Sequence, residues 1–319
     1  MLISKRDCGN SVIDKKVVVV IVTYLAEHWV DYCLGGLKAY FDKLTVVVID
    51  NNSQDYTVQR IKNDYPEVIL FENKENLGFG KANNIGLKYA IENDCDYVFL
   101  LNQDACVYPG AIEKLILAHK EAPKFGVISP IHLDGTGNRF DSKFFLYLTQ
   151  SHGIKMIYDR IIHNKSSSVP YETKFVNAAA WLITKECLTK VGGFDPIFPH
   201  YGEDNDYLRR VREKGFKIGI CSTGFINHNR DQNYKMTMIP IHMVYIKTLL
   251  KLKSSKKGLV NTFVESIFCL LVNAVKSLLK LNFKRSLNFI GIIITLLKSY
   301  SEIKKSINVE HKSCLAYLE

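Results

Sequence analysis

Carboxylate side chains stand at three positions where a folded chain could use them for chemistry. Asp50 closes the apolar run 46–50, and Asp104 follows the apolar run 97–101. The segment 203–206 holds three acids in four residues at the start of a predicted helix. A positioned carboxylate can bind a divalent cation or take a proton from an attacking hydroxyl group. These residue types therefore predict a site that binds a cation and a hydroxyl-bearing ligand.

Each of these acids also has a plainer structural reading. Asp50 could begin an Asx-turn, Asp104 could open a loop, and one acid of the segment 203–206 could cap the helix. Three acids in four residues exceed what capping needs, so we expect at least one of them to face a ligand. Thr23 and Tyr24 end a neighbouring apolar run, which favours a pocket wall shared with Asp50.

Other polar or bulky residues admit two interpretations each. The glycines of the segment 76–87 could let the backbone approach a phosphate at a helix N-terminus, or form an ordinary left-handed turn. The segment matches neither a Walker A nor a GxGxxG pattern. His228 has polar neighbours and could bind a metal or phosphate, or be a structural histidine. Trp181 could line a pocket or the core, and Asp195 could contact an acceptor or form a turn.

Strands and helices alternate over the first 120 residues. This rhythm predicts a parallel, doubly wound sheet whose ligands lie at the carboxyl ends of the strands. Thr23, Asp50 and Asp104 all stand at such ends. The predicted strands are 17–22, 44–49, 68–72 and 97–101, and the predicted helices are 29–40, 57–63, 82–91 and 111–119.

The following part of the chain is less regular. We expect strands over 127–130, 175–184, 216–221 and 224–229, a loop at 166–168, a turn at 191–195 and a helix over 203–214 closed by Gly215.

Charge divides the chain unevenly. The 319 residues carry a net charge of +10, and residues 239–319 hold 13 Lys and Arg against 4 Asp and Glu. Apolar residues recur there at helical spacing, but the uncharged stretches 266–275 and 286–297 are shorter than the roughly 18–20 residues that span a bilayer. We expect helices that lie on an anionic membrane, pack on the main domain or form a dimer contact. The predicted domains are an extension over 1–16, a main domain over 17–238 and this helical region.

Five segments together resemble a known family. They are IVTY (21–24), VVIDNNSQD (47–55), NLGFGKANNIGL (76–87), FLLNQDACVYPGAI (99–112) and GGFDPIFPHYGEDNDYLRRVREKGFKI (192–218). The chain resembles the inverting glycosyltransferases of family 2, which have the GT-A fold, and is most similar to their rhamnosyltransferase-like branch. The resemblance covers about residues 17–230. It implies an α/β fold with a mostly parallel, Rossmann-like sheet, followed by the basic, amphipathic helical region.

The resemblance also implies roles for residues of this chain. Asp204 matches the catalytic base, with Glu203 beside it, and Trp181 and Asp195 are expected at the acceptor. Asp104 and His228 match metal-binding positions for Mg²⁺ or Mn²⁺, although Asn102 stands where the DxD-type motif has its first acid. The residues implied around a nucleotide sugar are Thr23, Tyr24, Asp50, Asn52, Asn76, Gly78, Phe79, Asn83, Asn102 and Asp104.

The implied reaction transfers a sugar from a dTDP-rhamnose-like or UDP-sugar donor to a hydroxyl of a glycan or lipid-linked saccharide, in cell-surface polysaccharide synthesis. We expect a cytoplasmic protein, peripheral on the inner face of the cytoplasmic membrane, without a nucleic-acid partner and with a homodimer as one possibility. Two alternatives are a nucleotidyltransferase on a similar sheet and a non-enzymatic membrane or nucleic-acid adaptor. The first usually has a glycine-rich basic loop after its first strand, and TYLAEHW stands there instead.

Overall fold

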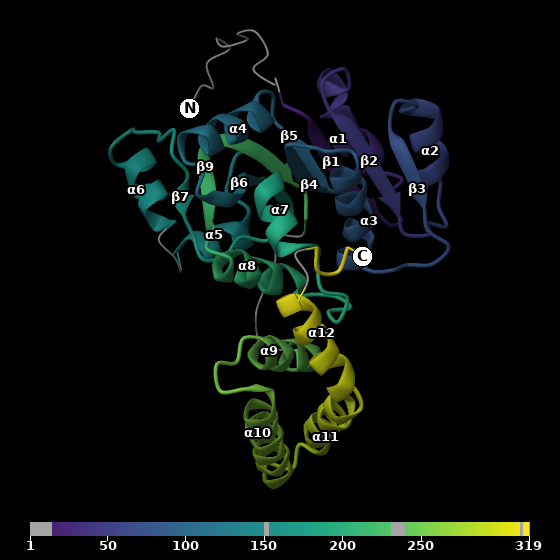
Figure 1. Ribbon diagram of the computed structural model, residues 1–319, viewed down its shortest axis with the longest axis vertical. Helices are drawn as coiled ribbons and strands as arrows, with labels where there is room; N and C mark the ends of the chain where they lie inside the picture. The colour runs from purple at the N-terminus through teal and green to yellow at the C-terminus, as the bar shows by residue number, and fades with distance from the viewer. Residues whose placement is uncertain (1–14, 150–152, 231–239, 313–314, 319) are drawn as a thin grey trace.

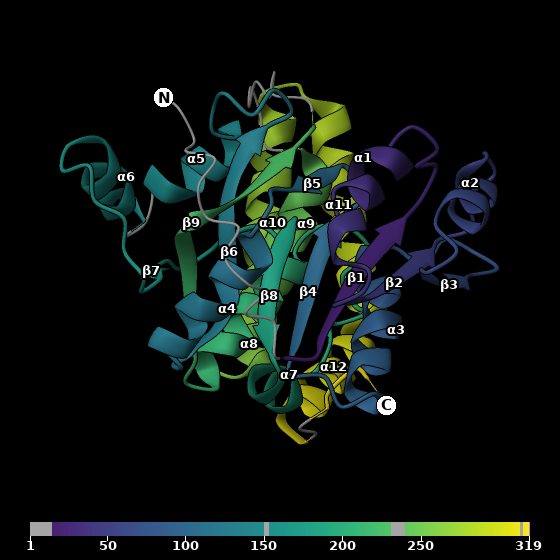
Figure 2. The same ribbon diagram turned by 90° about the horizontal axis from the view of Figure 1, so that it is seen from above.

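The protein consists of a large α/β body and a group of helices that projects from it (Figure 1). The computed structural model describes residues 15–149, 153–230, 240–312 and 315–318. A nine-stranded sheet runs through the body in the order β3-β2-β1-β4-β8-β6-β9-β5, and β7 pairs with β9. Helices cover both faces of this sheet, as the view from above shows (Figure 2). The expected α/β class with a C-terminal helical region is confirmed.

The first half of the sheet is parallel. It is formed by β1 (Val17–Thr23), β2 (Thr45–Asp50), β3 (Ile69–Glu72) and β4 (Tyr97–Asn102). Runs of β-branched residues suit these strands because both faces of the sheet are buried. The register pairs Thr23 with Asp50 and Val22 with Asn102, so the carboxyl ends of β1, β2 and β4 meet at one edge.

The second half is mixed in direction. β6 (Phe125–Asp134) runs parallel to β9 (Lys217–His228), and β8 (Ala180–Thr184) lies antiparallel between β4 and β6. β5 (Ala105–Val107) and β7 (Tyr171–Glu172) are antiparallel to β9. A strand was predicted over 175–184, but only its second half pairs. The two strands predicted over 216–229 form the single β9, because an irregular register opposite residues 129–131 lets it continue past Gly224.

Two apolar layers sandwich the sheet. Alternate residues of β1 face α1 (Val30–Gly35), α2 (Thr57–Asp64) and α4 (Ala111–Glu121) on one side. The intervening residues face α3 (Phe79–Glu92), α5 (Ser142–Thr149), α6 (Ile154–Ile161), α7 (Lys185–Val191) and α8 (Glu203–Glu213) on the other. The helix predicted over 29–40 is divided into α1 and the 3-10 turn η1 (Lys38–Tyr40), because two glycines follow Leu34.

The projecting region has a core of its own. Helices α9 (Ile241–Lys253), α10 (Leu259–Leu279), α11 (Phe283–Lys298) and α12 (Tyr300–Lys312) pack around buried residues that include Phe263, Leu270 and Leu296. Phe198 of the main body joins this cluster. Beyond α12, residues 315–318 lie on the body beside α3 (Figure 1). There Leu318 lies in the core, and the Ala316 carbonyl accepts a hydrogen bond of 2.8 Å from the Gly193 N–H.

Helix α3 lies close against the sheet at Gly86, which provides a stability test. A Cβ atom at Gly86 would lie 2.4 Å from Val20 Cγ1, so Gly86→Ala should overpack the core and lower the free energy of unfolding by about 1–3 kcal/mol. Gly291→Ala in α11 is the matched control, because, apart from its chain neighbours and the backbone of its own helix, no atom of the described structure lies within 4 Å of its built Cβ. Thermal denaturation should show a lower Tm for Gly86→Ala and an unchanged or higher Tm for Gly291→Ala. Equal Tm values for Gly86→Ala and wild type would contradict this packing.

Candidate active site

The first wall of the site is a hydrogen-bonded cluster around Asp50. Its Oδ1 accepts hydrogen bonds from the hydroxyls of Thr23 (2.9 Å) and Ser53 (2.6 Å), and its Oδ2 accepts one from the Ser53 N–H (2.8 Å). The Ser53 hydroxyl also accepts the N–H of Leu25 at 2.9 Å. Asp50 is almost fully buried. The carboxylate therefore closes its own turn and joins the loops that follow β1 and β2.

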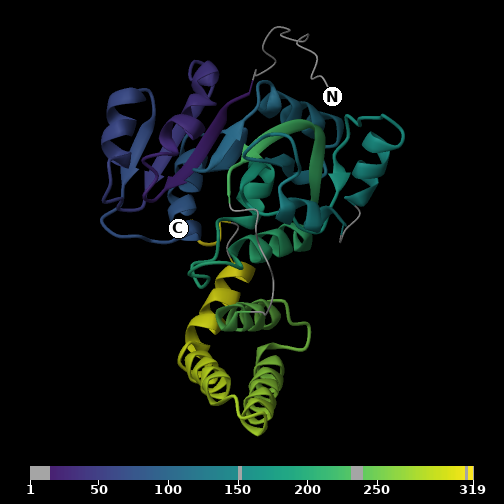
Figure 3. The same cartoon turned by 180° about the vertical axis from the view of Figure 1, so that it is seen from behind.

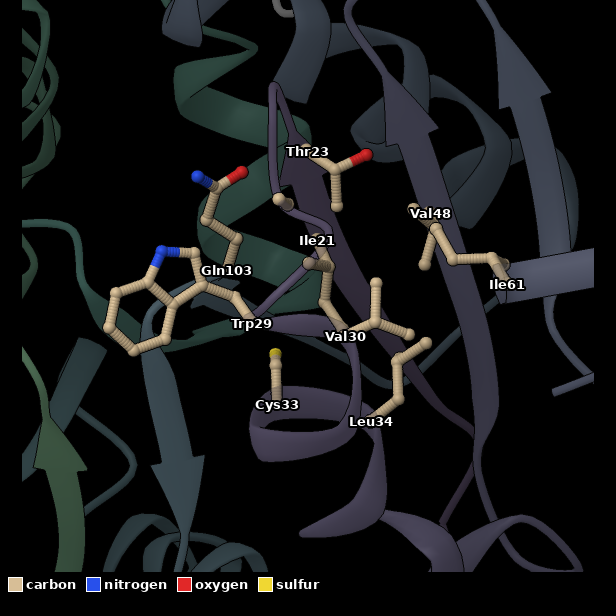
Figure 4. Close-up of a pocket in the computed structure, with 10 residues that line it drawn as sticks. Ile21, Thr23, Trp29, Val30, Cys33, Leu34, Val48, Ile61 and Gln103 are labelled. Carbon is tan, nitrogen blue, oxygen red and sulfur yellow. The ribbon is translucent and has the colours of Figure 1, made fainter. Parts of the chain in front are cut away.

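Gln103 fixes the loop after β1 to the end of β4. Its Oε1 accepts the Tyr24 N–H at 2.8 Å, and its Nε2 donates to the Tyr24 carbonyl at 3.2 Å. Figure 4 shows Gln103 and Thr23 near one end of a small hollow, with Trp29 beside Gln103 and the apolar side chains of Val30 and other residues lining the rest. The Tyr24 ring remains substantially exposed beside this wall.

The glycine segment before α3 is tied to the same wall. Asn51, next to Asp50, accepts the Leu77 N–H at 3.4 Å and donates to the Gly78 carbonyl at 3.3 Å. Gly78 has φ +79°, and a Cβ there would lie 2.8 Å from the Pro199 carbonyl oxygen, so the position requires glycine. Its N–H donates to Asn76 Oδ1 at 2.9 Å.

The other predicted residues of these loops have local contacts. Asn52 has a left-handed backbone, with φ +63°, and its side-chain oxygen accepts from Gln54 at 3.0 Å. Asn83 donates to the Phe79 carbonyl one turn earlier in α3, at 2.9 Å. The Phe79 ring packs edge-on against Phe194, with 5.8 Å between the ring centroids.

Asp104 and His228 are brought together by strand pairing. Ala105 of β5 pairs with His228 of β9, and His228 Nε2 lies 3.3 Å from Asp104 Oδ1. Asn102 Nδ2 lies 3.5 Å from the same imidazole nitrogen, and Asn102 Oδ1 is buried without a hydrogen-bond partner in the part of the chain that the structure describes. His228 is buried, whereas Asp104 is partly exposed. An acid, an imidazole and an unsatisfied amide oxygen therefore share one small region.

Asp141 lies behind His228. Its Oδ2 is 3.8 Å from His228 Nδ1 and accepts from Arg230 Nε at 2.7 Å. Burial alone would raise the pKa of Asp141, but the hydrogen bond and charge of Arg230 outweigh it and lower that pKa to about 2. Asp141 is thus an ionised carboxylate on the side of the imidazole away from Asp104.

The acids at the start of α8 have two different environments. Asp206 is fully buried and pairs with Arg209 (2.7 Å) and Arg210 (2.9 Å). Burial opposes ionisation of Asp206, but these charges and that of Lys253 outweigh burial and lower its pKa. Asp206 is therefore a structural residue.

Glu203 and Asp204 are acids of this segment whose pKa values are raised. Burial, followed by the charge of Asp204, raises the pKa of Glu203 to about 7. Burial raises the pKa of Asp204 to about 6, against hydrogen bonds from the Asn205 N–H (2.7 Å) and side-chain amide (3.0 Å). Glu203 Oε2 is buried and has no hydrogen-bond partner among the residues placed by the structure. Perturbed carboxyl pairs of this kind are typical of functional sites.

Glu203 adjoins the glycine segment as well. A Cβ built on Gly80, in the first turn of α3, would lie 3.7 Å from Glu203 Cβ. Contacts therefore run from Asp50 through Asn51 and Gly78 to the start of α3, and from there to Glu203.

Two predicted acceptor residues lie elsewhere. Trp181 is fully buried in β8, where its ring packs on Phe194 at 6.2 Å and Tyr207 at 5.8 Å between centroids. Asp195 is also buried and accepts hydrogen bonds from Lys253 and Ser306 of the helical region. Burial of both side chains fits their core and turn interpretations. Their contact with an acceptor stays a prediction.

The structure thus places a strand-end wall and a perturbed acid pair on a mixed α/β sheet, an arrangement that suits an α/β enzyme. Residues 18–180 match the sequence family glycosyl transferase family 2, and the chain belongs to this family. It is therefore a glycosyltransferase, as the sequence predicted. The nucleotidyltransferase and adaptor alternatives are set aside by this result.

Curated relatives include two rhamnosyltransferases. The chain is 25% identical over 230 residues to the N-acetylglucosaminyl-diphospho-decaprenol L-rhamnosyltransferase of Mycobacterium tuberculosis, covering 66% of this chain and 75% of the relative. It is 24% identical over 238 residues to the dTDP-rhamnosyl transferase RfbF of Shigella flexneri, covering 72% and 75%.

Among solved structures, S. aureus TarS 1-349 in complex with UDP resembles the chain with a TM-score of 0.53 at 13% identity. The alignment covers 90% of this chain and 91% of that one. The likeness supports the GT-A fold.

Several residues of the site escaped the sequence analysis. Ser53, Gln103 and Asn51 hold the first wall together, and Asp141 with Arg230 lies behind His228. Ser53 and Gln103 stand inside the motifs that were singled out, so their positions offered a signal. Asp141 follows no apolar run, and its place depends on the long-range pairing of β6 with β9.

The raised pKa of Glu203 predicts a pH-dependent stability. Between about pH 4.5 and pH 7 the folded protein retains a proton on Glu203 that the unfolded chain releases, so stability falls as the pH rises through this window. Glu203→Gln removes this penalty and should raise the free energy of unfolding at pH 8 by about 1–3 kcal/mol relative to wild type. The difference should shrink at pH 5. Urea denaturation at both pH values measures it, with Glu121→Gln at the exposed end of α4 as control. A gain independent of pH would contradict the assignment.

Proposed function

We propose that this glycosyltransferase moves a sugar from a nucleotide-diphosphate donor to a hydroxyl of a glycan or lipid-linked saccharide, with inversion, in cell-surface polysaccharide synthesis. The observation that carries the proposal is the perturbed pair Glu203–Asp204 adjoining the glycine segment, which is bonded to the Asp50 wall. The rhamnosyltransferase relatives favour a dTDP-rhamnose-like donor. A UDP-sugar is the second candidate, since a TarS structure holds UDP.

The donor would lie along the strand ends. In this proposal Thr23, Tyr24, Asp50 and Asn52 form the nucleoside side, with the exposed Tyr24 ring available to a base or ribose. The segment 76–79 and Asn83 would face the diphosphate, because the start of α3 presents backbone N–H groups and the positive end of a helix dipole. Asn102 and Asp104 would complete the site from the end of β4.

Asp204 is the proposed general base. Its pKa of about 6 leaves it ionised at neutral pH and still basic enough to accept a proton. In the reaction Asp204 takes the proton of the acceptor hydroxyl as that oxygen bonds to the anomeric carbon. The bond from this carbon to the diphosphate oxygen breaks, and the nucleoside diphosphate leaves with the electron pair. A single displacement inverts the configuration, and Glu203 supports Asp204 by staying largely protonated until about pH 7.

The region around Asp104 fits a divalent cation, either Mg²⁺ or Mn²⁺. It offers the partly exposed Asp104 carboxylate, His228 Nε2 at 3.3 Å and the unsatisfied Asn102 oxygen. No group of three or more His, Cys, Asp or Glu in the described ranges has metal-binding spacing, but Mg²⁺ often takes only one or two carboxylates and completes its shell with water and substrate phosphates. A bound cation would offset charge on the departing diphosphate. Asp104 and His228 are the residues that would hold it.

The helical region would bring the enzyme to its acceptor. Its excess of cations suits an anionic membrane, and a lipid-linked saccharide is held at such a surface. We therefore place the protein in the cytoplasm, peripheral on the inner face of the cytoplasmic membrane.

Substitution of the base separates binding from transfer. Asp204→Asn should bind the donor within about threefold of wild type, yet lose at least about 10²-fold in transfer rate, because general-base catalysis is worth that much. Nucleotide release from dTDP-rhamnose and from UDP-sugars measures turnover, and calorimetry measures binding. Glu121→Gln at the exposed end of α4 should behave as wild type. Unaltered turnover in Asp204→Asn would reject this residue as the base.

Substitution of Asp104 or His228 tests whether a divalent cation helps to bind the donor. Asp104→Asn and His228→Ala should bind the donor more weakly than wild type when Mg²⁺ or Mn²⁺ is present, and should differ little from wild type in EDTA. Calorimetric titration with and without the metal measures this difference. Asp64→Asn, on the exposed end of α2, is the control. A wild-type affinity that does not respond to metal would refute the cation, while leaving the role of Asp204 intact.

A further inference from the structure

Helices α10 and α11 form a hairpin at the end of the molecule farthest from the sheet. Figures 1 and 3 show it beyond α9 and α12, with its turn pointing away from the body. The inner faces of the hairpin are buried against each other and the neighbouring helices through residues such as Leu270, Ala274 and Leu296. No other described helix packs on the outer faces, whose side chains are exposed. These side chains therefore determine what the hairpin can bind.

The outer faces carry two apolar stripes. Each stripe has five residues at the spacing 4-3-4-3, which keeps them within an arc of about 100° on one side of a helix. Their exposed fractions range from 41% to 68%. The α10 stripe is Val264, Phe268, Leu271, Val275 and Leu278, and the α11 stripe is Phe283, Leu287, Ile290, Ile294 and Leu297.

The turn that joins the stripes is more exposed still. Leu279 and Leu281 are 78% and 77% exposed, and Lys280 stands between them. Isolated exposed leucines are normal on proteins, but a continuous set on two adjacent helices marks an interaction surface.

The charges beside the stripes have one sign. Residues 266–301 contain five cations and no acid. The acid just before this span, Glu265, already pairs with Lys257 at 3.0 Å. The five cations are Lys276, Lys280, Lys284, Arg285 and Lys298.

This charge pattern selects the partner. Stripes at heptad spacing would also suit a second copy of the hairpin, but two copies face to face would bring cationic surfaces together and repel. An anionic lipid surface neutralises the same lysines and buries the same apolar side chains. The helix Leu259–Leu279 is long and apolar enough to cross a membrane by length and composition, with hydropathy 1.6, but 33% of its most apolar 18-residue window is buried inside the protein. A hairpin that lies in the interface fits better than one that spans the bilayer.

We propose that the α10–α11 hairpin is the element that enters the membrane interface. The two stripes and the turn leucines lie among the acyl chains, and Lys276, Lys280 and Lys284 contact anionic headgroups. The inference rests on the membrane contact proposed above for residues 239–319 and names its surface. Helices α9 and α12 stay outside the lipid, because Lys253 and Glu310 form ion pairs with the body.

Sedimentation of the full-length protein with vesicles tests the hairpin. Wild type should bind vesicles of mixed phosphatidylglycerol and phosphatidylcholine, and bind pure phosphatidylcholine at least about tenfold more weakly. Lys280→Gln with Lys284→Gln should weaken binding to the anionic vesicles roughly 25-fold, at about fivefold for each lysine near the surface. Leu281→Ser with Phe283→Ser and Leu287→Ser should weaken it at least about tenfold on both vesicle types.

The controls separate membrane binding from folding and from catalysis. Tyr56→Ser with Leu117→Ser removes exposed apolar side chains of the main body and should leave vesicle binding unchanged. All variants should keep the wild-type Tm and the wild-type release of nucleotide in a vesicle-free assay. If neither wild type nor any variant releases nucleotide, the proposed reaction is contradicted, but the vesicle-binding result still stands.

Three outcomes would overturn the proposal. The first is wild type that does not bind anionic vesicles, and the second is hairpin variants that bind as well as wild type. The third is a wild-type dimer in light scattering that the serine variant converts to a monomer, because the stripes would then cover each other rather than lipid.

Discussion

A buried group of charges holds helix α8 to the projecting helices. Asp206 of α8 pairs with Arg209, and Arg209 also contacts Glu310 of α12 at 2.7 Å. Lys253 of α9 lies 3.1 Å from Glu310 and bonds Asp195 of the body. Loss of any partner would leave a charge unpaired in the interior, which typically costs about 3–5 kcal/mol. Because α8 begins at Glu203, the same charges set where the acid pair points.

This arrangement explains how one short acidic segment provides two kinds of carboxyl group. Asp206 points toward the arginines and is ionised inside the protein. Glu203 lies three residues earlier, against Gly80, and its Oε2 has no hydrogen-bond partner in the described structure. The arginines that pair with Asp206 therefore separate a structural ion pair from a perturbed acid. Burial raises the pKa of both Glu203 and Asp204; the charge of Asp204 raises that of Glu203 further, and hydrogen bonds from Asn205 hold that of Asp204 lower.

Local patterns predicted the first half of the fold well. The β-branched runs of β1, β2 and β4 and the glycine segment before α3 have the expected form, and their ends meet as parallel register requires. The direction of β8 could not be predicted, because an apolar run looks the same in a parallel and an antiparallel strand. The sequence also could not decide between a pocket and the core for Trp181, because a tryptophan occurs in both. The 3.3 Å approach of His228 to Asp104 depends on pairing between segments more than a hundred residues apart.

The return of the chain after α12 makes the last residues part of the main body. Ala316 packs against Gly192 and Gly193, the Tyr317 carbonyl accepts from Asn84, and Leu318 lies in the core beside them. The core of the body that begins at Val17 is therefore incomplete around Gly193 until residues 316–318, which follow the helical region in the chain, have packed there. The helical region thus lies between two parts of the sequence that belong to the same core.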